Sequence, residues 1–256
     1  MTVSLIVPVY RAEPWIDECM ASIRAQTYKD IELIVIDDAQ GSGAAAARNR
    51  GLDKATGEYV AFCDADDYLA PDAIEKMVAA MNGVDMVCGS FRKFGKFDAV
   101  VQHETKVMSR GHVAEYAMRN LCFPMKYQML SGCWAKLYRR KKIGRFPALT
   151  TGEDLAFNFE YLMKCKEVRF ISDIVYHNRK RDGSLTTTFD EKNKKGLFGF
   201  LEALGYVRKY LGQFYPEHEV EFALDNSKAY HSALYFMRIM EQTGKSPGDT
   251  LMRLYA

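Results

Sequence analysis

Residues 57–69 read GEYVAFCDADDYL, in which five apolar residues run directly into a cluster of three aspartates. The apolar run 59–63 predicts a short buried strand, because it is rich in β-forming residues and is bounded by glycine and polar residues. Two similar runs, 3–9 and 31–36, precede it, and a segment with helical spacing opens at Pro14 between them. Strand, helix and strand in that order predict a parallel βαβ unit.

Strand and helix patterns continue to alternate along the chain. Helices are expected over 44–55 and from Pro71 to Asn82-Gly83, and a fourth strand over 86–88, which together predict a three-layer α/β domain. The pattern weakens over 90–108, where an antiparallel excursion is expected. The later elements predicted are helices at 112–121 and 154–164, strands at 168–171 and 174–178, and helices at 191–211 and 217–243.

Composition limits the classes of function. The 256 residues are 48% hydrophobic and 27% charged, which excludes a largely disordered or collagen-like chain. The formal net charge is only +2, so no nucleic-acid partner is expected, since phosphate contacts need a strong basic excess. No signal-like segment, no run of ~18 uncharged apolar residues and no CxxC pair is found. We therefore expect a cytoplasmic protein with reduced thiols, whose membrane contact, if any, is peripheral on the inner face.

Polar residues follow each of the first three predicted strands. They are Pro8-Val9-Tyr10-Arg11, Asp37-Asp38 and Asp64-Ala65-Asp66-Asp67. Ligands of open α/β sheets bind beyond the carboxyl ends of the strands, so five carboxylates are expected at one edge. Turn formation and helix capping would explain some of them. A divalent cation together with ribose hydroxyls would relieve their repulsion, and carboxylates at D-x-D spacing suit Mg²⁺ or Mn²⁺.

Five motifs, in the order VSLIVPVY, IVIDD, ARNRGL, GEYVAFCDADDYL and GED, resemble the family 2 glycosyltransferases of the GT-A fold. The resemblance is greatest to bacterial enzymes that build capsule, O-antigen and exopolysaccharide, and it covers roughly residues 3–188. It implies a Rossmann-like α/β catalytic domain with a mostly parallel sheet over residues 1–189, followed by a helical extension over 190–256. It also implies metal-dependent, inverting transfer of a sugar from a nucleotide donor, most often a UDP-sugar, to a hydroxyl of a glycan or lipid-linked glycan.

The resemblance carries roles over to individual residues. The implied nucleotide-sugar contacts are Pro8, Tyr10, Arg11, Asp37 or Asp38, Arg48, Asp64 with Ala65, Arg179 and Arg181. The implied ligands of Mn²⁺ or Mg²⁺ are Asp66 and Asp64, with His177 completing the metal shell or touching the diphosphate. A lone histidine after a strand is otherwise usually structural, and residues 179–181 would also suit a solvated loop. Residues 184–188 would form a lid that orders when the donor binds.

The pair Glu153-Asp154 resembles the catalytic segment of the family. The implied general base is Asp154, with Glu153 as its neighbour; general-base help is worth about 10²–10⁴-fold in rate. The alternative is the acidic first turn of a helix, because Thr151 precedes the pair and acidic residues favour that end. The two interpretations are compatible.

The segment 132–138 resembles the acceptor side of the family, with Trp134 and Lys136 as its candidate contacts. Tryptophan is more often a core residue, so packing is the alternative for Trp134. Six basic residues and no acid lie between Lys136 and Arg145. A solvated helix face, a membrane surface or a lipid pyrophosphate acceptor would each explain this basic run.

One stretch departs from the family pattern. Family members carry D-D-G-S-x-D, then a helix and a strand, before the A-R-N segment, whereas here residues 37–43 lead directly to Ala44. Either a stretch is missing from this sequence, which the likeness of residues 40–43 to the later loop favours, or the protein has a true deletion. A deletion would remove a strand and one wall of the nucleotide pocket.

Two rival functions remain. A non-catalytic relative of the same fold would bind nucleotide or glycan without transfer. A nucleotidyltransferase would share the sheet type, but the chain has no G-x-G-x-x-G or phosphate-binding P-loop motif. The helical extension is expected to form a homodimer, to touch a membrane or to shape the acceptor site.

Overall fold

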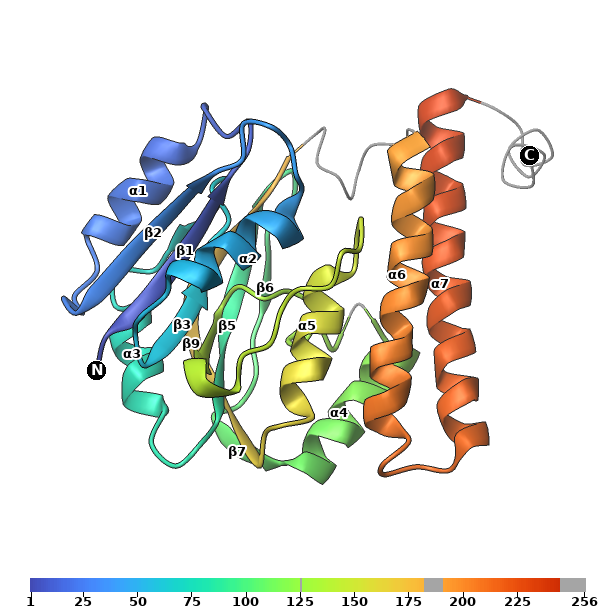
Figure 1. The fold of residues 1–256 in the computed structure, drawn as a ribbon. Coiled ribbons are helices and arrows are strands. Elements are labelled where there is room, and N and C mark those ends of the chain that lie inside the picture. Colours follow the sequence, from blue (N-terminus) through green and yellow to red (C-terminus); the bar gives the residue numbers. More distant parts are fainter. Residues whose placement is uncertain (125, 182–190, 245–256) are drawn as a thin grey trace.

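The computed structural model describes residues 1–124, 126–181 and 191–244. Nine strands of this part form one sheet in the order β2-β1-β3-β8-β5-β9-β4, with β6 beside β5 and β7 beside β9 (Figure 1). The lid expected at 184–188 and the boundary expected at 189/190 lie outside the described residues.

The N-terminal half builds the parallel part of the sheet. Its elements are β1 (Val3–Val9), α1 (Ile16–Arg24), β2 (Ile31–Asp37), α2 (Ala44–Lys54), β3 (Tyr59–Phe62), β4 (Tyr68–Leu69), α3 (Ala73–Ala80) and β5 (Met86–Gly95). β1 pairs in parallel with β2 and β3, and β5 pairs in parallel with β9. The β1–β2 and β5–β9 pairings are the longest of the sheet, and together with β1–β3 they confirm the mostly parallel α/β sheet that the alternating pattern predicts.

The second half adds antiparallel strands and four helices to the described structure. Its elements are β6 (Ala99–Val101), β7 (Lys106–Ser109), α4 (Arg110–Cys122), β8 (Lys136–Arg139), the 3₁₀ turn η1 (Arg140–Lys142), α5 (Glu153–Leu162), β9 (Glu167–Lys180), α6 (Glu191–Leu211) and α7 (Glu217–Thr243). The β5–β6 hairpin and β7 confirm the antiparallel excursion.

Two expectations of secondary structure are corrected. The solvated helix face offered for the basic run is wrong at its start, because residues 136–139 form the strand β8, buried between β3 and β5. The two strands expected at 168–171 and 174–178 are one strand, β9. A register shift opposite Gly89–Phe91 accommodates the break, since Gly89 pairs with Ile171 and Ser90 with Ile174.

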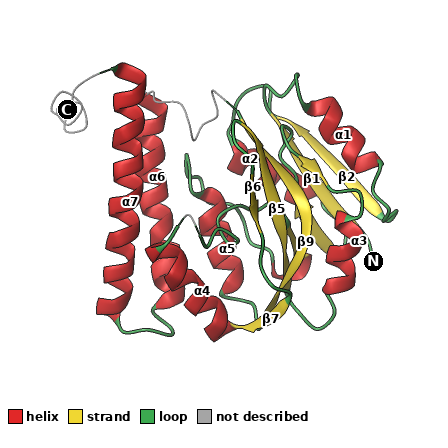
Figure 2. Ribbon diagram, turned by 180° about the vertical axis from the view of Figure 1, so that it is seen from behind, coloured by secondary structure: helices red, strands yellow, loops and turns green. Residues whose placement is uncertain are grey.

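Helices cover both faces of the sheet (Figure 2). α2 lies over β1 and β2 at close range because Gly51 has no side chain; a Cβ there would come within 2.4 Å of Ile6. On the same face, Phe157 of α5 packs edge-on against Phe62 of β3, the register partner of Ile6. α1 and α3 lie together on the other face, joined by the buried Gln26, whose amide bonds the backbone of Ala70 and Ile74.

The C-terminal helices pack against the α/β domain. α6 lies along α5, and α7 lies against α4 (Figure 1). The buried Tyr210 of α6 meets Phe159 edge-on and donates to the Arg110 carbonyl at 3.0 Å. At Gly199 a Cβ would come within 2.8 Å of the Thr151 carbonyl, so α6 touches the segment that leads into α5. Among the described helices, none combines the length and the apolar character that crossing a membrane requires.

β2 is the edge strand beside β1 and leaves an apolar face open. Leu33 is 39% exposed and Val35 is 45% exposed, whereas Ile34 and Ile36 are buried on the face that α2 covers. The chain then enters α2 through a short connection, in which the Gly41 N–H donates to the Asp38 carbonyl at 2.7 Å. The short stretch noted at residues 37–43 is thus a closed turn in the structure.

Candidate active site

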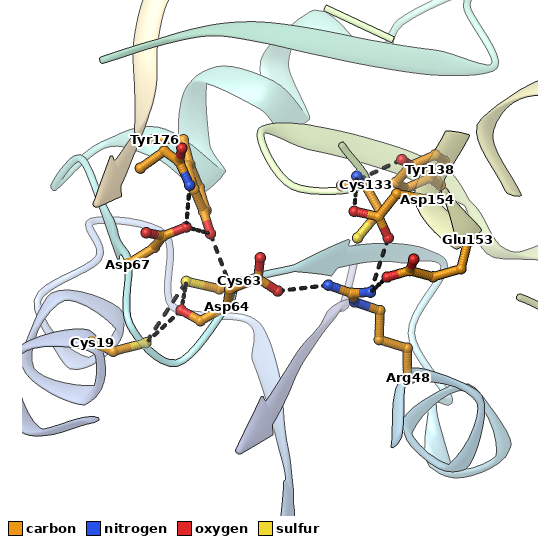
Figure 3. A network of polar contacts seen from close by, with 11 residues as sticks. Cys19, Arg48, Cys63, Asp64, Asp67, Cys133, Tyr138, Glu153, Asp154 and Tyr176 are labelled. Atoms are coloured by element: carbon orange, nitrogen blue, oxygen red, sulfur yellow. Dashed lines mark hydrogen bonds and ion pairs between the residues drawn. The ribbon is translucent and has the colours of Figure 1, made fainter. Parts of the chain in front are cut away.

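The candidate site lies at the carboxyl end of β3, where the chain turns over residues 64–67 toward β4. The Asp67 N–H donates to the Asp64 carbonyl at 3.0 Å and closes this turn. The first turn of α5 faces it, so the sheet and a helix from distant parts of the sequence bring carboxylates to one place (Figure 3).

Arg48 of α2 stands between these two groups of acids. The residue is only 4% exposed, and its guanidinium donates to the Asp64 carboxylate at 2.8 Å. It also donates to Glu153 at 3.0 Å and to Asp154 at 2.9 Å (Figure 3). Phe146 packs against its flat face, with the guanidinium carbon 5.5 Å from the ring centroid. One buried cation therefore balances three carboxylates.

Glu153 and Asp154 form the first turn of α5, directly after Gly152 in the left-handed conformation at φ +79°. This confirms the acidic helix start that the sequence predicts. Burial, and then the charge of Asp154, raises the pKa of Glu153 to about 7, against the opposing effect of Arg48. The second oxygen of Asp154 accepts from the Cys133 N–H at 3.2 Å. The pair is thus held in a fixed orientation at the site.

The turn at 64–67 is fixed from β9 by a buried tyrosine. The Tyr176 hydroxyl donates to Asp67 at 2.7 Å and accepts from the Asp64 N–H at 3.0 Å (Figure 3). Asp67 also accepts from the Asn178 amide at 2.9 Å and the Arg179 N–H at 2.6 Å. Burial, and then the charges of Asp64 and Asp66, raises the pKa of Asp67 to about 8.

Asp66 points toward the end of β9. The Arg181 Nε donates to its carboxylate at 2.8 Å, and the Arg179 Nε donates to its carbonyl at 2.9 Å. Arg181 also lies over the ring of Trp15, 4.3 Å from the centroid. The structure therefore brings both predicted arginines to the turn that carries Asp64 and Asp66. Between these two aspartates lies Ala65, which is buried.

The two carboxylates expected to bind a metal ion, those of Asp64 and Asp66, lie on the turn after β3. Across the residues that the structure describes, no group of three or more His, Cys, Asp or Glu side chains could hold a metal ion by itself. His177 does not join the aspartates: its ring stacks on Tyr68 at 4.3 Å, and no hydrogen bond or ion pair links it to Asp64 or Asp66. Two carboxylates nevertheless fit Mg²⁺ or Mn²⁺, which commonly share one or two carboxylates with substrate phosphates.

The expected nucleotide side lies where β1 and β2 end. Tyr10 is exposed, and the Arg11 guanidinium carbon lies 5.1 Å from its ring centroid. Pro8 precedes them at the end of β1. The connection after β2 reaches this aromatic residue, since a Cβ on Gly41 would lie 3.3 Å from the Tyr10 ring. The shortened loop therefore borders the Tyr10 ring directly.

The two aspartates after β2 differ in surroundings. Asp38 is buried and accepts from the Gly43 N–H at 3.0 Å, from Arg50 at 2.7 Å and from Ser42. It thus holds the connection and the start of α2 together. Asp37 is exposed at the end of β2. Of the two alternatives for a nucleotide contact, Asp37 has the accessible carboxylate.

The two acceptor candidates also differ. Trp134 is half-buried, stacked on Tyr176 with 5.0 Å between centroids and edge-on to Phe91 at 4.6 Å. Lys136 is only 3% exposed; its Nζ donates to the carbonyls of Gly132 and Trp134, and burial lowers its pKa. Trp134 therefore presents part of its ring at the site, while Lys136 supports the backbone beneath it.

The basic run after Lys136 makes contacts at the other end of the strands. Arg140 donates to the Gly57 carbonyl at 2.5 Å, and Lys142 pairs with Asp85 at 2.7 Å. Arg145 pairs with Asp53 on the surface. Gly57 and Asp85 precede β3 and β5, so these contacts lie away from the strand ends that carry the site. Ion pairs, and hydrogen bonds to backbone carbonyls, therefore explain much of the basic run between Lys136 and Arg145.

Three contributors to the site were not predicted as such. The sequence predicts Tyr176 and Asn178 only as residues of a strand, and it predicts Cys133 only as part of the acceptor segment. The resemblance implies a place for Arg48 on the nucleotide side, whereas its hydrogen bonds go to Asp64 and to the acids in the first turn of α5. No local pattern in residues 175–178, which read VYHN, marks Asn178 as part of the site.

Comparisons with known proteins support the fold and identify the family. A protein of the same fold, residues 1–349 of S. aureus TarS in complex with UDP-GlcNAc, superposes with a TM-score of 0.67 at 19% identity, covering 89% of this chain and 71% of that chain. The chain is 27% identical to glycosyltransferase GlyA of Streptococcus pneumoniae, over 86% of the chain and 38% of that protein. It is 29% identical to the putative glycosyltransferase EpsH of Bacillus subtilis, over 74% of the chain and 64% of that protein. The chain thus spans less than two thirds of either curated relative.

The family model described as glycosyl transferase family 2 matches residues 4–42 and 39–145. The two matches meet at residues 39–42, where the connection between β2 and α2 is short. Together they include β1, the Arg48 segment of α2 and the turn at 64–67, and the solved structures confirm the expected GT-A fold. With more than half of its residues matched, the chain belongs to glycosyl transferase family 2.

Proposed function

We propose that this chain transfers a sugar from a nucleotide-sugar donor to a hydroxyl of a glycan or lipid-linked glycan in bacterial surface polysaccharide synthesis. The observation that carries the proposal is the bridge made by Arg48 between Asp64 and the pair Glu153-Asp154. This bridge supports the proposal, because it brings a carboxylate proposed for the metal and donor close to the proposed base. The UDP-GlcNAc held by TarS, which shares the fold, supports a UDP-sugar as donor.

Asp154 is the proposed general base. Arg48 holds one of its oxygens and the Cys133 N–H holds the other, which orients the carboxylate while leaving lone pairs for an acceptor hydroxyl. A sugar hydroxyl is too weak an acid to ionise beforehand, so its proton moves to Asp154 as the new C–O bond forms. The bond from the anomeric carbon to the diphosphate breaks on the opposite side, and the configuration inverts.

The donor diphosphate is proposed to lie against the turn at 64–67 and the arginines of β9. Asp64 and Asp66 would hold Mn²⁺ or Mg²⁺, which supplies positive charge where the leaving diphosphate becomes more negative. Arg179 and Arg181 already stand at this turn and would turn from Asp66 toward phosphate oxygens. Pro8, Tyr10, Arg11 and Asp37 would border the nucleoside.

Release of UDP from a panel of UDP-sugars tests the proposal. The wild type should hydrolyse or transfer at least one donor with Mn²⁺ and none with EDTA. Asp66→Ala and Asp154→Asn should abolish UDP release while the protein remains folded. Full activity in Asp154→Asn would remove the base assignment. A wild type that binds UDP but turns over no donor, with or without a glycan acceptor, would identify the non-catalytic relative instead.

The helical part is proposed to shape the acceptor side. The contact of α6 with Thr151, two residues before Glu153, supports this role, because the proposed base lies in the next turn of the chain. We also propose that the chain divides into two parts at about residue 190 and that the protein is cytoplasmic. As further roles, α6 and α7 would form a homodimer or touch the inner face of the membrane. Size-exclusion chromatography with light scattering and sedimentation with lipid vesicles test the last two roles.

A further inference from the structure

A buried lysine lies behind the segment that holds the proposed base. Lys136 is the first residue of β8 and is only 3% exposed, and its Nζ donates to the carbonyls of Gly132 and Trp134. An ammonium group that bonds backbone carbonyls rather than a carboxylate is costly to bury. A methionine would fill this position without that cost, so the charge indicates a role beyond packing.

One peptide group connects Lys136 to the base. The Gly132 carbonyl, which accepts from the ammonium, and the Cys133 N–H belong to the same peptide group. That N–H donates to the Oδ2 atom of Asp154 at 3.2 Å (Figure 3). Because a peptide group is planar, a bond that fixes its oxygen also fixes the direction of its N–H. A cation at the oxygen also polarises the group and strengthens the N–H as a donor.

The segment that carries this peptide has a strained backbone. Ala135 adopts φ +53°, which is uncommon for a residue with a side chain. A Cβ on Gly132 would come within 2.5 Å of the Trp134 ring, so the chain folds tightly back on itself here. The Lys136 ammonium bonds both ends of this tight segment, and the buried Asn158 of α5 donates to the Gly132 carbonyl at 2.9 Å. These bonds hold a conformation that local backbone preferences oppose.

Asp154 is held by two contacts of different kinds. Arg48 bonds one of its oxygens at 2.9 Å but also bonds the carboxylates of Asp64 and Glu153. The Cys133 N–H bonds the other oxygen. Two contacts are needed to fix a carboxylate against rotation, so the orientation of Asp154 depends on the peptide as well as on the guanidinium. If the peptide moved, the base would stay bound to Arg48 and yet turn away from an acceptor hydroxyl.

We propose that Lys136 is a positioning residue for the transfer step, which orients Asp154 through the Gly132–Cys133 peptide. The inference rests on the proposed function and adds a residue to its site. Lys136 then does not make the acceptor contact that the resemblance implies for it, because its ammonium is buried against the backbone. A shift of a reacting group by about 1 Å can cost ~100-fold in rate, so the effect should be seen in kcat.

Steady-state UDP release with Mn²⁺ tests this role, with UDP-GlcNAc and the other UDP-sugars of the panel as donors. The variant is Lys136→Met, which keeps the length of the side chain and removes the ammonium; Lys136→Gln replaces it if Lys136→Met does not fold. Arg139→Met is the matched control. Arg139 lies on the same strand and donates to the carbonyls of Val84 at 2.9 Å and Met81 at 3.2 Å, away from the site.

Lys136→Met should lower kcat about tenfold or more, while donor KM and UDP affinity stay within about twofold of the wild type. Arg139→Met should keep the wild-type kcat. The proposal is overturned if Lys136→Met keeps its kcat, or if only the donor KM changes. Failure of both Lys136 variants to fold would make the residue structural and would also overturn the proposal.

A second measurement follows the peptide itself and needs no turnover. Labelling the six cysteines with ¹⁵N gives one amide signal for each, and Cys133→Ala and Cys165→Ala identify two of them. The amide of the buried Cys165, which bonds a helix carbonyl, corrects for a general loss of stability. Relative to it, Lys136→Met should speed hydrogen exchange of the Cys133 amide about tenfold or more, and Arg139→Met should not.

The two measurements separate this inference from the proposed function. Unchanged exchange of the Cys133 amide in Lys136→Met would overturn the positioning role. A wild type that releases no UDP from any donor would contradict the proposed function instead, and the exchange of the Cys133 amide would still show whether Lys136 holds the peptide.

Discussion

The guanidinium of Arg48 lies 2.9 Å from the carboxylate of Asp154, although 106 positions of the sequence separate these two residues. The same guanidinium holds Asp64 at 2.8 Å. Because Arg48 is buried, it supplies the positive charge that keeps these carboxylates together in a region of low solvent access. The position of the base thus depends on a helix from the first half of the chain.

Replacing Arg48 with methionine should therefore damage both stability and catalysis. Removing one partner of a buried ion pair typically costs about 3–5 kcal/mol, because the remaining charges stay buried without compensation. UDP release should fall at least ~100-fold, since Asp154 loses its orientation. Urea unfolding and donor turnover measure the two effects. Arg145→Met, which removes an exposed pair with Asp53, is the control and should change neither. Equal behaviour of the two variants would contradict the role of Arg48.

Glu153 should make stability depend on pH. Its pKa is raised from 4.5 to about 7 in the folded state, so the folded protein binds this proton more tightly than the unfolded chain does. Its contribution to stability is complete below about pH 4.5 and is lost as the pH rises through 7. The wild type should therefore gain stability relative to Glu153→Gln between pH 8 and pH 5, by up to about 3 kcal/mol. Urea titrations of both proteins at the two pH values measure this difference, and a gap that is constant with pH would contradict the assignment.

Much of the fold could be predicted because its signals are local. The alternation of strands and helices through residue 88, and the aspartates at the end of β3, follow from spacing within single segments. β8 could not be predicted, because its basic residues resemble a helix surface. Its strand form depends on β3 and β5, which bury Leu137 and Tyr138 between them.

The candidate site shows the same division. Motifs predicted which strand ends meet, since parallel strands align their carboxyl ends. They did not predict the partners of Arg48, nor the contact of Tyr176 with Asp64 and Asp67. Those contacts depend on how α2 crosses the sheet and on the register of β9 beside β5, which no local pattern specifies.

The hydroxyl of Tyr176, and not its ring, should affect the binding of Mn²⁺ and of the donor. Tyr176→Phe keeps the ring that stacks on Trp134 but removes the two hydrogen bonds that hold the turn at 64–67. We expect a higher Mn²⁺ concentration for half-maximal activity, by roughly 10-fold, and a higher donor KM, because Asp64 and Asp66 lose their alignment.

Tyr161→Phe is the matched control for this effect. Tyr161 is equally buried, and its hydroxyl accepts from the Arg139 N–H at 2.9 Å and donates to the Asp85 carbonyl at 2.7 Å, away from the site. Both variants should lose similar stability. Only Tyr176→Phe should change the dependence on Mn²⁺, measured by UDP release across a metal titration. The same metal dependence in both variants would show that Tyr176 has only a structural part.

The exposed face of β2 predicts self-association. Leu33 and Val35 project from an edge strand whose outer backbone groups pair with no strand of the described sheet, an arrangement that favours pairing with another chain.

The double variant Leu33→Lys, Val35→Lys should therefore remain monomeric up to a higher protein concentration than the wild type. It should lose little stability, because both positions are already partly solvated. Light scattering over a concentration series measures the change. Ile34→Lys and Ile36→Lys, on the buried face of the same strand, should instead unfold the domain, which separates an effect of the exposed face from a general effect of lysine in β2. A wild type that is monomeric at all concentrations, or a double variant that associates as strongly as the wild type, would show that this edge is protected in solution.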